Sequence, residues 1–130
     1  MLIFGHTFIP AAEFYHIFDI DSIKKTPPSS ILYLHFHKDN LDIIDHLRLN
    51  NMNFALEVSN ITELIYAAAL DASYIFVQKK LAKTAQNIAE SYLFDAKILV
   101  HINKESEIEE MALLGIDGVV FPEAIVKISS

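Results

Sequence analysis

Residues 54–77 read FALEVSNITELIYAAALDASYIFV, and they give the clearest indication of the fold class. It holds a short apolar run at 54–58, an amphipathic segment that begins after Asn60, and a second apolar run at 74–77. That order is typical of a strand, a helix and the next strand. Because a chain that returns through a helix re-enters a sheet in the same direction, the two strands are predicted to be parallel.

The same pattern extends in both directions, and it predicts the fold class. We expect an α/β protein with a five-stranded parallel sheet and flanking helices, a flavodoxin-like arrangement covered on both faces. The alternative is half of a (βα)8 barrel, completed by a second copy of the chain. The five apolar runs are Ile31–Leu34, Phe54–Val58, Tyr74–Val77, Lys97–Val100 and Gly118–Phe121.

The helices between these runs carry start and stop signals. Asn60 with Glu63 three residues later is a capping-box pattern, and Gly115 is typical of the residue after a helix end. The first helix is predicted to start after residues 39–40 and the second after Asn60. The third is predicted to span about 81–92, and the fourth to run from Ser106 to Gly115.

We predict a single domain, 1–130, with an N-terminal extension. Residues 1–26 contain two aromatic alternating stretches and are predicted to form a β-hairpin. Residues 27–30 begin with two prolines and form a stiff connector into the strand–helix core at 31–130. The apolar N-terminal strands would cover an open sheet face or extend an edge, and any remaining apolar surface would form a homodimer.

Composition excludes several classes of function. The 130-residue chain is 52% hydrophobic, enough for one core, and lacks an apolar run long enough to span a membrane. No signal-peptide pattern begins it, so we expect a cytoplasmic protein. The absence of cysteine excludes disulfides and thiolate chemistry, and the net charge of −7 argues against nucleic-acid binding. Three glycines supply no phosphate-binding loop, and we expect no cofactor.

Three segments carry a resemblance to response-regulator receiver domains. Residues 31–40 are similar to the first strand and acidic loop of that family, 58–64 to its second strand and helix start, and 115–122 to its fifth strand and proline. The resemblance implies a flavodoxin-like fold and a regulatory role through a protein partner.

The residues that the receiver family uses for phosphotransfer are replaced. The matching positions hold His35 and Phe36, Gln78, His101 and Phe121 in place of the acidic pair, the phosphoacceptor aspartate, the Thr or Ser, and the Lys. The resemblance therefore implies a degenerate receiver-like domain, a non-catalytic interaction or regulatory module. Residues 56–58 with 69–77 also resemble consecutive units of phosphate-utilising (βα)8 barrels.

Polar side chains at the strand ends are the candidate site. His35 and His37 alternate along one predicted strand, His101 ends another, and Glu57 lies near the end of a third. These residues suggest either a metal site, with His35, His37 and His101 as ligands, or a hydrogen-bonded rim without metal. The metal alternative predicts a small metal-dependent hydrolase or lyase, and we favour the module without catalysis. The full candidate cluster is His35, His37, Glu57, Gln78, His101 and Glu123.

Overall fold

The computed structural model describes residues 1–128, so the last two residues of the predicted domain lie outside the described part. Within it, a single sheet contains eight strands, all parallel to their neighbours. The strands are β1 (Leu2–Phe4), β2 (Phe14–His16), β3 (Ile31–His35), β4 (Phe54–Glu57), β5 (Tyr74–Val77), β6 (Lys97–His101), β7 (Gly118–Val120) and β8 (Ile125–Lys127).

The predicted helices are present, and the start signal at Asn60 and the stop signal at Gly115 act as expected. Asn60 accepts a hydrogen bond from the backbone N–H of Glu63 at 2.9 Å, and Gly115 has a φ of +74° in the left-handed region. The helices are α1 (Leu41–Leu49), α2 (Ile61–Ala69), α3 (Ala82–Ser91) and α4 (Ser106–Leu113). In the described part of the chain, no helix is long and apolar enough to cross a bilayer.

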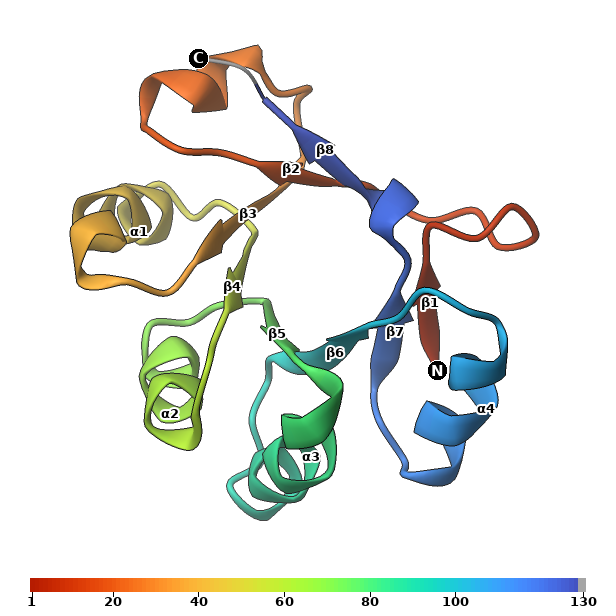
Figure 1. Ribbon diagram of the computed structural model, residues 1–130. Coiled ribbons are helices and arrows are strands. Elements are labelled where there is room, and N and C mark those ends of the chain that lie inside the picture. Colours follow the sequence, from red (N-terminus) through yellow and green to blue (C-terminus); the bar gives the residue numbers. More distant parts are fainter. Residues whose placement is uncertain (129–130) are drawn as a thin grey trace.

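The sheet curls into a ring, with α1 to α4 around its outside (Figure 1). The strand order is β1-β7-β6-β5-β4-β3-β2-β8, so the chain from β2 to β7 always steps to the neighbouring strand. Right-handed crossovers that step in one direction place every helix on the same face of the sheet. The α/β class and the parallel sheet are confirmed, but five strands was wrong, and the fold is closer to the half-barrel alternative than to an open sheet.

The N-terminal and C-terminal strands form the two ends of the sheet. β1 pairs with β7, whereas β2 pairs with β8, and the 3-10 turn η4 (Pro122–Ala124) joins β7 to β8. One continuous segment, 118–127, therefore contacts both ends of the sheet. The predicted hairpin was wrong: β1 and β2 do not pair with each other, and β2 ends at His16. The strands extend the sheet because their unpaired edges find partners on the C-terminal segment.

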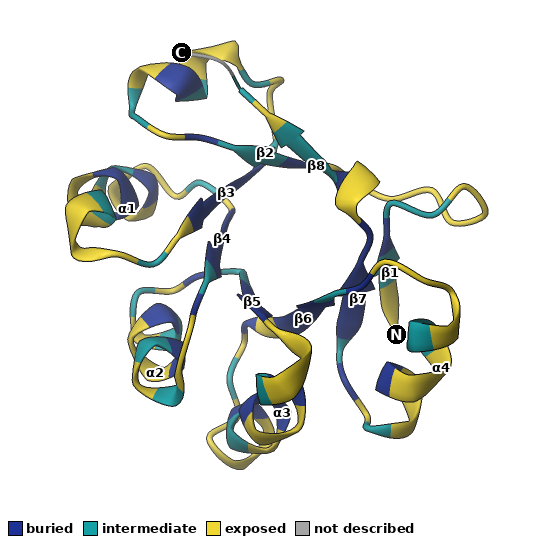
Figure 2. Cartoon of the chain, viewed as in Figure 1, coloured by how far each residue is buried: buried dark blue, intermediate teal, exposed yellow. Residues whose placement is uncertain are grey.

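Aromatic side chains fill the interior of the ring. The rings of Phe14 and Phe4 have centroids 4.9 Å apart, and those of Phe14 and Phe76 are 5.0 Å apart. These residues come from β2, β1 and β5, so opposite walls of the ring touch. Figure 2 shows the strands mostly buried and the outer sides of the helices exposed. A second apolar cluster, which includes Leu34, Leu64 and Ile98, packs between the sheet and the helices.

Candidate functional site

Five strands end in polar side chains at one mouth of the ring, and a sixth, β5, is followed directly by Gln78. Parallel strands place their carboxyl ends on the same edge, and alternate residues of each strand face the interior. The inward positions below this edge are apolar or aromatic and belong to the inner cluster, as with Phe14 and Phe76. The polar set at the mouth is His16, His35, Glu57, Gln78, His101 and Lys127.

Glu57 is the centre of this set. Its Oε1 accepts hydrogen bonds from the Tyr33 hydroxyl and from His101 Nε2, the latter at 2.6 Å. Its Oε2 accepts one from Gln78 Nε2 at 3.0 Å. The Glu57 side chain is only 12% exposed, so the three donors take the place of water around a nearly buried carboxylate.

These contacts keep Glu57 ionised. Burial alone would raise the pKa of Glu57, but the hydrogen bonds from His101 and Tyr33, the charge of His101 and the amide of Gln78 outweigh it and lower the pKa from 4.5 to about 2. Burial, together with the hydrogen bond to Glu57 and its charge, raises the pKa of the Tyr33 phenol. At neutral pH, Glu57 is therefore a carboxylate and Tyr33 a neutral donor.

The carboxylate also sets the tautomer of His101. An ionised Glu57 can only accept, so His101 Nε2 must carry a proton. In the neutral imidazole, Nδ1 is then the acceptor, with its lone pair free. No group in residues 1–128 makes a hydrogen bond to Nδ1. The ring also lines a pocket, so His101 lies between a fixed carboxylate and an open volume.

The pocket at this mouth has a volume of about 380 Å³. The His16 and His35 rings lie beside each other in it, with centroids 5.6 Å apart. Lys127 is the β8 partner of His16 in the sheet register, so the two side chains point to the same side. The lining residues are His16, Tyr33, His35, His101, Ile102, Asn103, Pro122, Ile125 and Lys127.

Four of the six predicted site residues come together at this mouth, namely His35, Glu57, Gln78 and His101. His37 lies elsewhere, because the strand ends at His35 and the alternation stops there. The His37 Nδ1 instead accepts a hydrogen bond from the Asp39 backbone N–H at 3.1 Å.

The sixth predicted residue, Glu123, is exposed on the turn η4 and does not line the pocket. The three histidines proposed as metal ligands are not gathered at one point either, because His37 lies outside the pocket that His35 and His101 line. Nowhere in residues 1–128 do three or more His, Asp or Glu side chains form a group that could hold a metal ion.

Tyr33, His16 and Lys127 were missed by the sequence analysis. Tyr33 stands in an apolar run and was interpreted as core, although its inward alternation with His35 is visible in the sequence. His16 has no second ligand-type residue at a matching spacing in the sequence, and Lys127 lies on a last strand that the sequence analysis does not predict. The places of His16 and Lys127 depend on how the chain ends pair.

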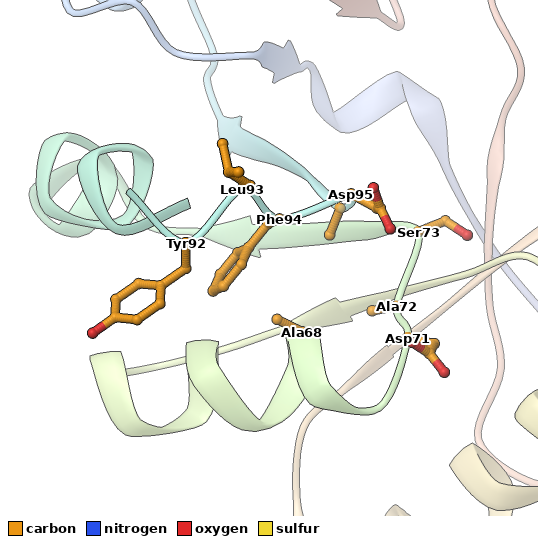
Figure 3. Close-up of a pocket in the computed structure, with 9 residues that line it drawn as sticks. Ala68, Asp71, Ala72, Ser73, Tyr92, Leu93, Phe94 and Asp95 are labelled. Carbon is orange, nitrogen blue, oxygen red and sulfur yellow. The ribbon is translucent and has the colours of Figure 1, made fainter. Parts of the chain in front are cut away.

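A second hollow lies at the opposite end of the ring, where β5 and β6 begin. Asp71, Ala72 and Ser73 line it from the turn before β5, and Phe94 and Asp95 from the turn before β6 (Figure 3). It contains none of the predicted site residues. Its two carboxylates have no basic partner in the lining, so it lacks the linked donors and acceptors of the strand-end mouth.

Comparison with known proteins adds no assignment. No family model matches the chain, and no curated protein matches it in sequence. A functional proposal therefore depends on the geometry of the mouth.

Proposed function

We propose that this protein is an enzyme that transfers a proton to or from a small polar substrate at the strand-end mouth. His101 is the general base, and Glu57 orients it. The observation that carries the proposal is the 2.6 Å contact between His101 Nε2 and Glu57, which leaves Nδ1 as the free nitrogen of a residue that lines the pocket. A base must have a free lone pair in the correct tautomer within reach of the substrate.

The roles of the neighbours follow from their hydrogen bonds. Tyr33 and Gln78 hold the Glu57 carboxylate, so Glu57 cannot turn away from His101. When His101 takes up a proton, the nearby carboxylate stabilises the imidazolium. The proposal keeps the hydrolase or lyase class from the sequence analysis and omits the metal, since these residues are not arranged as metal ligands.

The test is turnover by a substrate panel with matched variants. Purified protein is incubated in D2O with small hydroxy acids, keto acids and phosphate monoesters, and 1H and 31P NMR follow product formation and deuterium uptake. We expect turnover by the wild type, and a loss of about a hundredfold or more in His101→Gln, whose amide keeps the hydrogen bond to Glu57. His46→Gln on α1 is the control and should retain activity.

Turnover that is equal in the wild type and His101→Gln would contradict the proposal. The proposal would also be contradicted if the compounds of the panel bound to the protein without being changed, or did not bind at all. Either result would favour the non-catalytic receiver-like module, whose partner would then be sought among proteins.

A further inference from the structure

Basic side chains gather on one side of the strand-end pocket. His16 and His35 have ring centroids 5.6 Å apart, and Lys127 stands beside His16 on the neighbouring strand. All three line the pocket together with His101. They come from β2, β3 and β8, so the basic side forms only where the last strand meets the second.

Little negative charge offsets this side of the pocket. Glu57 is the nearby carboxylate that acts on His16, but its Oε1 is occupied by Tyr33 and His101 and its Oε2 by Gln78. The pocket lining itself contains no Asp or Glu. A bound anion would therefore meet the Lys127 ammonium and imidazole N–H donors without displacing an internal partner.

We propose that His16, His35 and Lys127 bind an oxyanion group, a carboxylate or a phosphate, of the small molecule that occupies this pocket. The inference rests on the proposed function in naming that molecule a substrate, because an anchor here would hold the rest of it beside His101. Three donors on different strands can surround the oxygens of one anionic group, and the pocket volume of about 380 Å³ limits the molecule to a small one.

The electrostatics of His16 support this assignment. Burial, followed by the positive charges of His35 and Lys127, lowers the pKa of His16 from 6.5 to about 4, and the charge of Glu57 acts in the opposite direction. Without an anion, His16 is thus neutral at pH 7. A bound anion would offset the charge of Lys127 and raise the pKa of His16, so binding would be accompanied by proton uptake.

The test measures anion binding without turnover. Histidine ring resonances of the wild-type protein are followed by NMR in titrations with inorganic phosphate and, separately, with malonate, with sodium chloride as the ionic-strength control. We expect one of the two anions to shift the His16 and His35 resonances saturably and to raise the pKa of His16. The anion that binds more tightly identifies the group as phosphate or carboxylate.

Two lysine variants separate this site from general charge. Lys127→Gln should weaken binding by about tenfold, since it removes a charged hydrogen-bond donor. Lys97 lies at the beginning of β6, at the end of the ring opposite to the pocket. Lys97→Gln should therefore leave binding unchanged. The inference is overturned if neither anion shifts the two histidines beyond the chloride control, or if both lysine variants weaken binding equally.

The outcome is distinguishable from a failure of the proposed function. His101→Gln should keep anion binding, because His101 is not among the three anchoring residues. Saturable anion binding in a protein without turnover would support the anion site and contradict the enzyme. Turnover that is unaffected by Lys127→Gln, with no effect of either anion on His16, would support the enzyme and contradict the anion site.

Discussion

Replacing Glu57 with Gln should destabilise the fold through the loss of one charge. The pKa of Glu57 is lowered from 4.5 to about 2, and each pKa unit corresponds to about 1.4 kcal/mol. The fold therefore favours the ionised side chain over the protonated one by about 3 kcal/mol. Gln has the size of the protonated acid and cannot ionise. Since the Glu57 side chain is only 12% exposed, water screens little of this energy. We expect Glu57→Gln to lower the free energy of unfolding by about 2 to 3 kcal/mol at pH 7.

The pH dependence gives the prediction a definite sign. A carboxyl group whose pKa is lowered in the folded state adds stability that is present above the pKa of the unfolded chain, near 4.5, and is lost as the pH falls toward about 2. The difference between the wild type and Glu57→Gln should thus be largest at neutral pH. By pH 3 it should fall to about half, because the unfolded chain is then protonated while the folded protein is still mostly ionised.

Urea unfolding at pH 7 and at pH 3, followed by circular dichroism, measures both quantities. Glu123→Gln is the matched control, because Glu123 is also a glutamate close to a strand end but is exposed. It should change the free energy of unfolding by less than about 0.5 kcal/mol. The reasoning is refuted if Glu57→Gln is no more destabilising than Glu123→Gln at pH 7, or if its effect is the same at both pH values.

Two further substitutions test the fold. Asn60→Ala removes the cap that accepts from the Glu63 backbone N–H at 2.9 Å, and should cost about 1 kcal/mol in urea unfolding; no loss would show that the cap is replaced by water. Gly118→Ala would place a Cβ 2.6 Å from Leu99 Cδ2 and 2.8 Å from Leu2 Cβ, and we expect a loss of about 1 to 3 kcal/mol by thermal or urea unfolding; a neutral result would mean that β1 can move away from β7.

The regular elements were predictable because their signals are local. The Asn60 cap, the left-handed Gly115 and the five apolar runs all depend on residues within a few positions of one another. These signals located four helices and five of the strands in the described chain. They say nothing of strand partners, since every inner strand is apolar on both faces and the pattern does not mark which face looks inward.

The pairing of the end strands that forms the ring was not predictable either, because these strands are short. β1 and β7 pair although Leu2 and Gly118 lie at opposite ends of the chain, and each of these strands has three residues. A three-residue run carries too little alternation to distinguish a hairpin from two separate parallel strands. The aromatic character of the N-terminal stretches was a partial signal: Phe4 and Phe14 are buried inside the ring, whereas Phe8 and Phe18 are exposed.

The site itself depends on this curvature. Glu57 stands on β4 and His101 on β6, with β5 between them. The register places Glu57 level with Leu99 rather than with His101, so in a flat sheet the backbones of Glu57 and His101 would be more than about 9.5 Å apart, which is twice the neighbouring-strand spacing. On the concave face of a ring, inward side chains converge, which shortens the gap that the two side chains must span to reach the observed 2.6 Å. The same curvature brings Lys127 beside His16. A base held by its carboxylate and a basic side for an anion are therefore consequences of how the chain ends pair, although the residues that form them lie in ordinary strand-end positions.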